Sequence, residues 1–508
     1  MPLAEVELRF LVPAASRAAI SAEFAHRHAA QEPVSLVSIY LDTPDHRLAH
    51  AGLSWWLRSE GGQWFQTLEA GGAHASERRE QVAVRPDATP EAAAHAGTRA
   101  GRRLAKVLRR ARADGLDTSA RFTIALRRAS CQVQAPGAAF EVVFEEGELT
   151  AGPASLGLCE LGFKRIFGSA AAMQALAESW RRRFALIHEP RTRLQRGQLL
   201  ADGVRFPPVR VASHLSYPHR ATPDQAMAAV VQDCLAQVTL NAIGLSEGDP
   251  GQRVERVHQL RIGVRRLRCA LRSFAGWTPV PPAELVEGLQ ALFTKLGKWR
   301  ESDVLLESIA GALDDAGAPR LVLGTPAPDG DIAQTIRSAA VQRTLLGWMA
   351  WSISRQDEAA MNAPLPSATD VSPGLDSREF RRRADRRLRR CHRRMAAGCR
   401  SFDDLDLAAL HALRKRIKRQ RYAVEFFTPL LRRRGVRRYL RLLAAVQDRL
   451  GELNDLAAAK TRLGKLVKTM PEAWFALGWI AARIAEVRAQ LKLECRRFAN
   501  ADVPQARH

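Results

Sequence analysis

The sequence predicts a multidomain chain of α and β type, in which an antiparallel β domain is followed by an all-α region. Up to about residue 200, short apolar stretches alternate with polar residues between Gly, Pro and Asp breaks, as in antiparallel sheets and barrels. From Pro223 onward, apolar residues recur every three or four positions, which indicates helices. We therefore expect a β domain over 1–200, a linker over 201–220 and an α region over 221–508.

The β domain contains several stretches with strand-like alternation. They are 4–12, 35–42, 53–59, 64–70, 78–84, 121–135 and 139–149. Helical spacing predicts inserted helices over 14–29, 98–113 and 169–185. Turn residues and weak periodicity make 201–220 a linker.

The α region divides into two similar halves, each expected to form a helical bundle. In the first half, over 221–361, helices are predicted at 224–243, 254–275, 281–299, 302–316 and 331–355. A stretch rich in Pro and Ser near 362–376 joins the halves. In the second half, over 376–508, helices are predicted at 377–400, 404–427, 436–450, 452–469 and 471–497.

The charge of the chain is strongly positive and unevenly distributed. The 508 residues include 77 Lys and Arg against 53 Asp and Glu, a formal net charge of +24. Residues 1–200 have a net charge of +5, and the remainder has +19. Such a field attracts anionic partners, and arginine, the more abundant base, suits bidentate contacts to phosphate oxygens.

Cysteine usage and the N-terminal sequence indicate a reducing compartment. The seven cysteines are scattered and form no C-x-x-C pair, which argues against a disulfide framework or a zinc site. The first ten residues, MPLAEVELRF, lack the features of a signal peptide. No uninterrupted apolar run reaches the length of a membrane span. We expect a cytoplasmic protein that has no membrane partner.

One basic segment occurs twice in the α region. VHQLRIGVRRLRCAL begins at Val257 and LHALRKRIKRQRYAV begins at Leu410, an offset of 153 residues without a gap. Residues three and four apart share a helix face. Each segment therefore forms a cationic stripe, and the members are His258, Arg261, Arg265, Arg268 and Arg272, then His411, Arg414, Lys418 and Arg421. Like charges at this spacing destabilise an isolated helix, so we expect a polyanionic ligand; a solvated basic face is the alternative.

The repeat extends beyond the stripes. Leu296-Gly297 follows His258 by 38 residues, and Leu450-Gly451 follows His411 by 39. An acidic region follows each Leu-Gly pair, with Glu301 and Asp303 in the first copy and Asn454 and Asp455 in the second. These groups could pair with the stripe arginines or bind a metal. The arginine-rich run over 378–400 is less specific and is explained equally well by solvation.

Near the N-terminus, two carboxylates and a guanidinium share one side of a predicted strand. Glu5, Glu7 and Arg9 alternate with apolar residues, so their side chains point the same way. Inside a barrel this set suits a divalent metal and a triphosphate, because Mg²⁺ prefers a few carboxylates plus phosphate oxygens. An outward polar face of an edge strand is the alternative.

The repeated segments, together with "LGKWRESDVLLESI" and "LGELND", resemble the CHAD domain family over about 220–508. The resemblance implies two four-helix bundles related by pseudo-twofold symmetry, whose histidines and basic residues bind inorganic polyphosphate. The residues that it implies are His258, Arg261, Arg265, Arg266, Arg268, His411, Arg414, Lys415, Lys418 and Arg421. Arg300-Glu301 departs mildly from the Arg-Asp that is usual in the second motif.

The first 200 residues resemble the CYTH, or triphosphate tunnel, family. The ExExK signature reads Glu5-Val6-Glu7-Leu8-Arg9, and "YLDTPDHRLAHAGLSWWLR", "RRE", "FTIALRR" and "RTRLQRG" follow in the family order. The resemblance implies an eight-stranded antiparallel tunnel that holds a triphosphate, with a divalent metal, Mg or Mn, that activates water. It assigns catalysis to Glu5, Glu7 and Arg9, the metal to Glu5, Glu7 and Glu160, and the substrate to Arg58, Arg78, Arg127 and Arg193, with Glu80 also matching.

Several tunnel positions depart from the family pattern. The closing lysine of the signature is replaced by Arg9, and Trp56 stands where an arginine is expected. Glu69 replaces a substrate lysine, and Glu145 replaces the aspartate of a "D-x-G" turn. The late ExExE strand keeps Glu160 alone. A carboxylate at position 69 would repel a triphosphate, and missing carboxylates would weaken metal binding.

The stripes are intact while the tunnel is altered, so the sequence favours polyphosphate binding, with a CYTH domain of reduced or absent activity. One alternative is a metal-dependent inorganic triphosphatase that its CHAD part recruits to polyphosphate. A nucleic-acid binder is a second alternative; it is less favoured because the α region has no recognisable RNA or DNA module. The expected partners are polyphosphate and triphosphate, and the expected location includes polyphosphate granules.

Overall fold

The computed structural model forms two compact units, which are described separately. Unit 1 comprises Met1–Pro208 and Arg337–Ala350, and unit 2 comprises Val209–Ile336 and Trp351–His508. The structure describes residues 7–27, 33–70, 78–86, 89–304, 307–319, 330–361 and 376–506.

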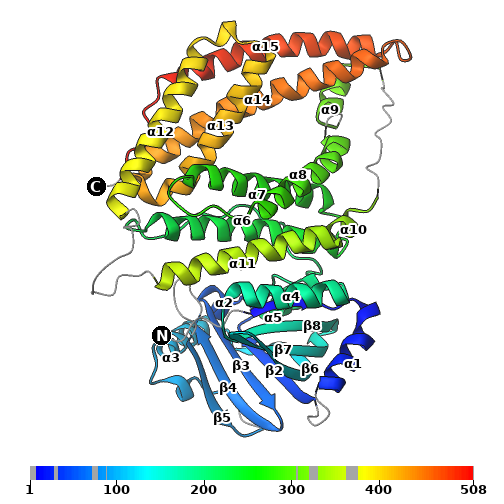
Figure 1. Cartoon of the computed structure of the whole chain (residues 1–508), viewed down its shortest axis with the longest axis vertical. Helices are drawn as coiled ribbons and strands as arrows, with labels where there is room; N and C mark the ends of the chain where they lie inside the picture. The colour runs from blue at the N-terminus through cyan, green and yellow to red at the C-terminus, as the bar shows by residue number, and fades with distance from the viewer. Residues whose placement is uncertain are drawn as a thin grey trace. The chain divides into compact units, whose positions relative to one another are not determined.

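Unit 1 is built on one antiparallel sheet, which confirms the predicted class of the N-terminal domain (Figure 1). The strands are β1 (Glu7–Leu11), β2 (Val34–Asp42), β3 (Leu53–Glu60), β4 (Gln63–Ala70), β5 (Arg78–Val84), β6 (Ser119–Ala135), β7 (Ala138–Ala151), β8 (Ala154–Phe167) and the two-residue β9 (Ile187–His188). Their order in the sheet is β5-β4-β3-β2-β6-β7-β8-β1-β9. Strand β8 was not among the stretches predicted from alternation.

Helices cover the outer face of this sheet. At one end lie η1 (Ala14–Ser16), α1 (Arg17–Arg27) and α4 (Ala170–Phe184), where Phe24 packs against Phe144 and Trp180. At the other end lie α2 (Arg47–His50), η2 (Ala92–His95) and α3 (Arg99–Ala113), where Leu104 and Trp55 belong to one buried cluster. The opposite, inner face of the sheet has an apolar cluster, which includes Phe122 and Ile124, and also a set of charged side chains, which includes Glu145 and Glu160.

One helix packs against the inner face. Helix α5 (Arg193–Ala201) was not predicted, and its Leu194 and Leu200 pack on a cluster that includes Phe122. A methyl group at Gly197 would lie 2.2 Å from the Phe122 ring, so only glycine permits this approach. Helix α5 therefore fills part of the inner face of the sheet.

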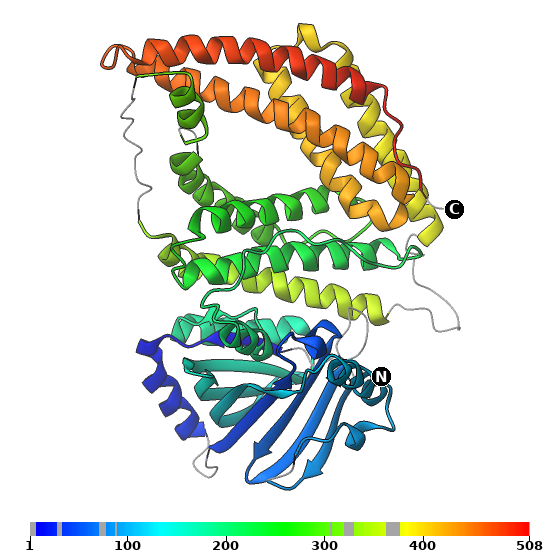
Figure 2. The same ribbon diagram turned by 180° about the vertical axis from the view of Figure 1, so that it is seen from behind.

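Unit 2 is helical, and its two halves confirm the predicted all-α class (Figures 1 and 2). The first half has α6 (Pro223–Ser246), α7 (Arg253–Phe274), α8 (Ala283–Val304), α9 (Glu307–Asp315), α10 (Ile332–Arg337) and α11 (Ala339–Met361), the last of which divides between the two units. The second half has α12 (Ser377–Arg400), η3 (Phe402–Asp404), α13 (Leu407–Phe427), η4 (Thr428–Leu430), α14 (Arg433–Leu466) and α15 (Ala473–Ala499).

Helices α8 and α14 occupy equivalent places in the two halves. The residues of α8 that are buried, Leu289, Leu292, Leu296 and Trp299, match buried Leu443, Val446, Leu450 and Leu453 of α14 at a constant offset. Helix α14 runs unbroken through Gly451, whereas the sequence predicted two helices, over 436–450 and 452–469. A single glycine weakens a helix by only about 1 kcal/mol, which tertiary packing overrides.

Among the described residues, α6 has the length and apolar composition of a membrane span. Its mean hydropathy over an 18-residue window is 1.3, and 72% of that window is buried inside the protein. Such burial is typical of the core helix of a folded domain.

Candidate functional site

The two cationic stripes lie on neighbouring helices of unit 2, α7 and α13, which pack against each other (Figures 1 and 2). Burial lowers the pKa of the Arg414 guanidinium; Asp455 opposes this shift, and Arg265 of the other stripe adds to it. Burial likewise lowers the pKa of Arg268, and the nearby Arg419 of α13 contributes. The stripes therefore form one electrostatically continuous surface, the cationic seam, defined by His258, Arg261, Arg265, Arg268, His411, Arg414, Lys418 and Arg421.

Several guanidinium groups of the cationic seam lack an anionic partner. Within the described part of the chain, no carboxylate lies within 4.0 Å of Arg265, Arg268 or Arg414. Arg421 differs, because its Nε lies 3.1 Å from Glu425 Oε1. Arginines that are partly withdrawn from water and close to one another favour a bound anion.

The glycines of the repeated Leu-Gly pairs lie next to arginines of the cationic seam. A methyl group at Gly297 would lie 3.5 Å from Arg261 Nη1, and one at Gly451 would lie 3.7 Å from Arg414 Nη2. Arg261 Nη1 also donates a hydrogen bond of 3.0 Å to the carbonyl of Leu296. Each glycine therefore lies at van der Waals distance from the equivalent arginine of its half, and a side chain longer than a methyl group would crowd that arginine.

Phe293 of α8 orients three arginines of the first stripe. Its ring centroid lies 5.0 Å from the guanidinium carbon of Arg261, 5.6 Å from that of Arg265 and 5.5 Å from that of Arg268. Cations are attracted to the face of an aromatic ring at such distances. The equivalent residue in α14 is Gln447, so the second half has no aromatic ring at this position.

The two histidines lead the stripes as predicted from their spacing. His411 is exposed, and its Nδ1 lies 3.3 Å from Asn454 Oδ1 of α14. His258 is half-buried at the corresponding place on α7. The side chains of Glu301 and Asp303 lie outside the described residues.

Two residues that the CHAD resemblance implied as polyphosphate ligands, Arg266 and Lys415, lie outside the two stripes. Arg266 is 2% exposed; its Nη2 lies 2.8 Å from Asp233 Oδ2 and its Nη1 donates to Gln237 at 2.9 Å. It therefore faces α6 in the core rather than the seam, because it is one residue out of phase with the stripe. Lys415 is exposed beside Arg414, where a bound chain could reach it.

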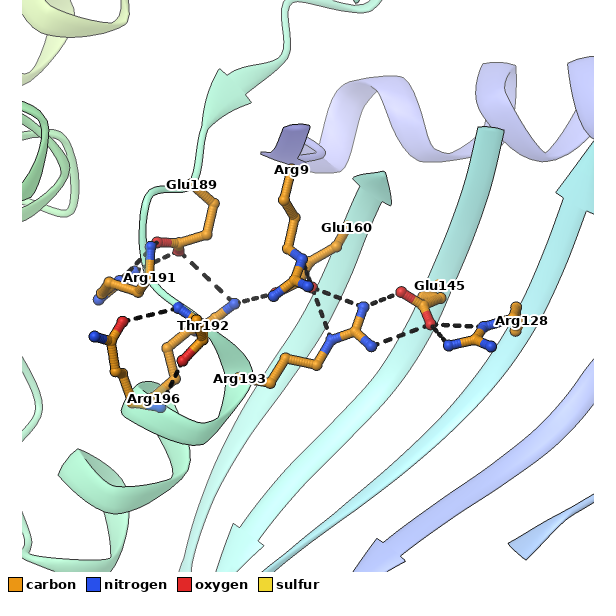
Figure 3. Close-up of polar contacts among 10 residues, drawn as sticks. Arg9, Arg128, Glu145, Glu160, Glu189, Arg191, Thr192, Arg193 and Arg196 are labelled. Carbon is orange, nitrogen blue, oxygen red and sulfur yellow. Dashed lines mark hydrogen bonds and ion pairs between the residues drawn. The ribbon is translucent and has the colours of Figure 1, made fainter. Parts of the chain in front are cut away.

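The inner face of the unit 1 sheet contains a continuous series of ion pairs (Figure 3). Glu145 of β7 accepts hydrogen bonds from Arg128, at 2.8 Å, and from Arg193 of α5. Glu160 of β8 contacts Arg193 at 3.0 Å, Arg196 of α5, and Arg9 of β1 at 3.6 Å.

The series continues at both ends. At one end, Glu189 lies 3.8 Å from Arg196 Nη1 and accepts from Arg191 Nη2 at 2.6 Å. Burial raises the pKa of Glu189, but the adjacent Arg191 and Arg196 outweigh it, so the pKa is lowered overall. At the other end, Arg128 approaches Glu60 at 3.7 Å, and Arg58 Nη2 lies 2.7 Å from that carboxylate.

The strand register places the residues that the CYTH resemblance implied on two different faces of the sheet. Arg9, Arg58, Arg193 and Glu160 come together on the inner face. Arg127 is exposed and pairs across the strands with Glu146, a residue that contacts Arg17 of the outer helix α1. Arg127 therefore lies on the outer face, because side chains alternate along a strand.

Of four other implied positions, only Glu80 has a described side chain. Arg78 lies in β5 opposite Ala70, but its side chain is outside the described residues. Glu80 is on the outer face, where its Oε2 lies 3.6 Å from His95 Nδ1. Glu5 lies outside the described residues, and of Glu7 only the backbone is described, opposite Lys164.

The residues that depart from the family pattern line the same inner face. Trp56 stacks on Tyr40 with ring centroids 5.3 Å apart, and Tyr40 stacks on Phe122 at 4.6 Å. Glu69 lies in β4 opposite Arg79. An aromatic stack thus occupies the place where the resemblance implied an additional arginine.

The described carboxylates of the inner face do not fit a divalent metal. Both oxygens of Glu160 contact arginines, and so do both oxygens of Glu145. No group of three His, Cys, Asp or Glu side chains in the described ranges is arranged to ligate a metal. Arginine guanidiniums occupy the positions in which a metal ion would meet these oxygens.

Sequence reasoning missed several residues that the structure brings into these sites. Arg128 has the same parity as buried Phe122, Ile124 and Leu126, so alternation alone could have placed it on the inner face instead of Arg127. Arg196 was missed because α5 was not predicted. Phe293 carried no signal of its own, since an aromatic residue in a helix is usually part of the core.

Two family models match the chain over ranges that together span most of its length. The model of the CYTH domain matches residues 3–189, and that of the CHAD domain matches residues 229–464. The chain therefore belongs to the proteins in which a CYTH domain is followed by a CHAD domain.

Solved structures resemble each part of the chain. The CHAD domain from the plant Ricinus communis is 30% identical, with a TM-score of 0.44, and the match covers 59% of this chain and 99% of that chain. An adenylyl cyclase candidate from Hippeastrum with a dominant triphosphatase activity is 12% identical, with a TM-score of 0.30, over 40% of this chain and 98% of that chain. An inorganic triphosphatase is 20% identical, with a TM-score of 0.16, over 34% of this chain and 79% of that chain.

Proposed function

We propose that this protein binds inorganic polyphosphate through the cationic seam of its CHAD domain. The observation that carries the proposal is the convergence of Arg265, Arg268 and Arg414 from two helices, with no described carboxylate within 4.0 Å of their guanidinium groups. A chain of phosphates supplies one negative charge after another along the seam. Each charge-assisted hydrogen bond contributes about 1.5–3 kcal/mol, so several contacts together give tight binding.

Lysine footprinting on the full chain tests the proposal. Both Lys415 and Lys418 are on α13; Lys418 belongs to the second stripe and Lys415 lies beside it. Acetylation with and without polyphosphate reports their accessibility. We expect polyphosphate to protect both lysines, and added salt to release the protection, because binding releases counterions. Lys465, exposed near the end of α14, serves as an unprotected control.

A charge-matched pair of variants separates the seam from general basicity. Arg265→Gln with Arg414→Gln removes two seam charges, whereas Arg393→Gln with Arg394→Gln removes two exposed charges from α12. Only the first pair is expected to abolish polyphosphate protection of Lys418. Equal loss in both pairs would show that the ligand recognises net charge and not the seam.

Nucleic acid is the competing ligand for this surface, and a competition assay distinguishes it. The aromatic residues near the ends of α7 and α13, Phe274 and Phe427, are fully buried, so they offer no platform for base stacking. We therefore expect long polyphosphate to displace a bound oligonucleotide at equal charge concentration. Failure to displace it would contradict the polyphosphate proposal.

We further propose that the CYTH domain has reduced or absent triphosphatase activity. The ion pairs that Glu145 and Glu160 make with arginines support this, because neither carboxylate is available to a metal ion. Purified protein should release little phosphate from inorganic triphosphate with Mg²⁺ or Mn²⁺. Rapid release that is lost in Glu5→Gln or Glu7→Gln would instead support the alternative, a metal-dependent triphosphatase recruited to polyphosphate. We also propose that the protein is found at polyphosphate granules in the cytoplasm, because it would bind the polyphosphate there through the seam.

A further inference from the structure

Helix α3 of unit 1 presents a second strongly cationic face, far along the chain from the seam. Its sequence, RAGRRLAKVLRRARA, contains basic residues and no acidic residue. The basic side chains are all exposed, and they are Arg99, Arg102, Arg103, Lys106, Arg109, Arg110 and Arg112. In the ranges that the structure describes, none of them forms an ion pair; Asp114, the acidic residue that directly follows α3, pairs with Arg47 at 2.5 Å.

The fold fixes this face toward solvent. Leu104 and Leu108 pack into a buried cluster with Trp55 and Leu68 of the sheet, so the apolar side of α3 is fully used. A methyl group at Gly101 would lie 1.7 Å from the carbonyl of His95, which shows how closely α3 approaches the preceding η2. The cations are therefore held on a rigid helix that cannot turn them inward.

The placement of these charges is unfavourable for the helix alone. Like charges three and four residues apart repel along the whole face. Arg99, Arg102 and Arg103 also lie in the first turns, where the helix macrodipole favours acidic residues and none is present. An anion bound along this face would relieve both effects.

We propose that the exposed face of α3 is a second binding surface for inorganic polyphosphate, on the CYTH domain but outside its tunnel. The choice of polyphosphate as the ligand rests on the proposed function of the cationic seam. The observations that make α3 an anion-binding surface are independent of that function. The helix is about 22 Å long at 1.5 Å per residue, so its cations average about one every 3 Å. A chain with one charge on every phosphate, and no sugar or base between them, matches this density.

Other anionic partners fit this face less well. The sequence of α3 contains no aromatic residue, so single-stranded nucleic acid has no stacking platform on it. Its leucines are buried against the sheet, so the helix has no apolar side chains to insert into a membrane surface. A phosphate chain requires only the charges that are present.

Lys106 allows a site-resolved test in the full-length protein. It is the single lysine of α3, whereas Lys415 and Lys418 report on the seam. We expect polyphosphate to protect Lys106 from acetylation. If Lys106 reacts equally with and without polyphosphate, the inference is wrong. If Lys106 is protected while both seam lysines stay reactive, the proposed seam function fails and the inference stands.

A triple variant provides the matched comparison. Arg102→Gln, Arg109→Gln and Arg110→Gln together neutralise α3 with residues of similar helix propensity. Protection of Lys106 should disappear, and the salt dependence of polyphosphate binding, as the slope of log K against log salt, should shrink by about two units. Arg182→Gln, Arg205→Gln and Arg220→Gln remove the same charge from exposed sites elsewhere and should leave both readouts unchanged.

An oligonucleotide of equal charge completes the test. It should protect Lys106 less than polyphosphate does at the same salt concentration. Stronger protection by the oligonucleotide would overturn the assignment of polyphosphate as the ligand of α3.

Discussion

Replacing Glu160 by glutamine removes the carboxylate that joins three arginines on the inner face of the CYTH sheet. The Glu160 side chain is 1% exposed and contacts Arg9, Arg193 and Arg196. Removing one partner from a buried ion pair costs about 3–5 kcal/mol, because the charges left behind are uncompensated. For a unit of this size, each kcal/mol lowers Tm by about 2–4 °C, so the Glu160→Gln variant should unfold about 6–20 °C lower.

Differential scanning calorimetry of the full chain measures the effect, with Glu146→Gln as the control. Glu146 lies one strand away on the outer face and is half-exposed, and the one ion pair that it makes with a described residue is with Arg17, at 3.7 Å. Exposed pairs of this kind contribute about 0–1 kcal/mol, so the control should unfold near the temperature of the unmodified protein.

Triphosphate adds a second readout to the same experiment. Without the Glu160 charge, the inner face has a larger excess of positive charge, so triphosphate should raise Tm more in Glu160→Gln than in the unmodified protein. If Glu160→Gln unfolds at the unmodified temperature, the carboxylate does not hold the arginines together. If triphosphate stabilises both proteins equally, Glu160 does not oppose anion binding.

Three further substitutions test other sites. Burial lowers the pKa of His188 to about 4, so the unfolded chain takes up a proton below about pH 6.5 and the folded chain does not. Stability should therefore fall by about 3 kcal/mol as pH drops from 6.5 to 4, and His188→Leu should flatten this dependence in urea titrations. Phe293→Leu should weaken polyphosphate binding about 10- to 150-fold, because it removes three cation–π contacts of about 0.5–1 kcal/mol each, whereas Phe293→Tyr should retain the affinity; equal affinities of the two variants would contradict the role of the ring. Gly451→Leu should displace Arg414 and weaken polyphosphate binding in a fluorescence titration, whereas Gly464→Leu, in open space on the same helix, should not.

The helix faces of the seam could be read from the sequence because their signal is local. Spacing of three and four placed Arg265 and Arg414 each on the same helix face as the other basic residues of its stripe, and the repeat placed those faces in equivalent helices. The same reasoning could not separate Arg266 from the stripe, because its partner Asp233 lies on another helix and only packing brings them together.

The tunnel was harder to predict because its geometry depends on strand parity and on an unrecognised helix. Arg127 and Arg128 are adjacent in the sequence, yet they point to opposite faces of β6. Helix α5 is short and contains Gly197, a residue that disfavours helices but is required for contact with Phe122. The ion pairs of Arg193 and Arg196 depend on that helix, so the pairing of Glu145 and Glu160 with arginines could not be predicted from the sequence.

Because Phe293 of α8 is replaced by Gln447 in α14, the two halves of the seam are not equivalent for a ligand whose two ends are identical. A polyphosphate chain is the same read from either end, and a perfectly two-fold surface would offer it two equivalent registers. Three arginines on α7 lie over an aromatic ring, whereas the equivalent position in α14 is Gln447, so under the proposed function the two halves would bind polyphosphate with unequal strength. The polyphosphate chain would then bind first to the arginines of α7 and extend from there across α13.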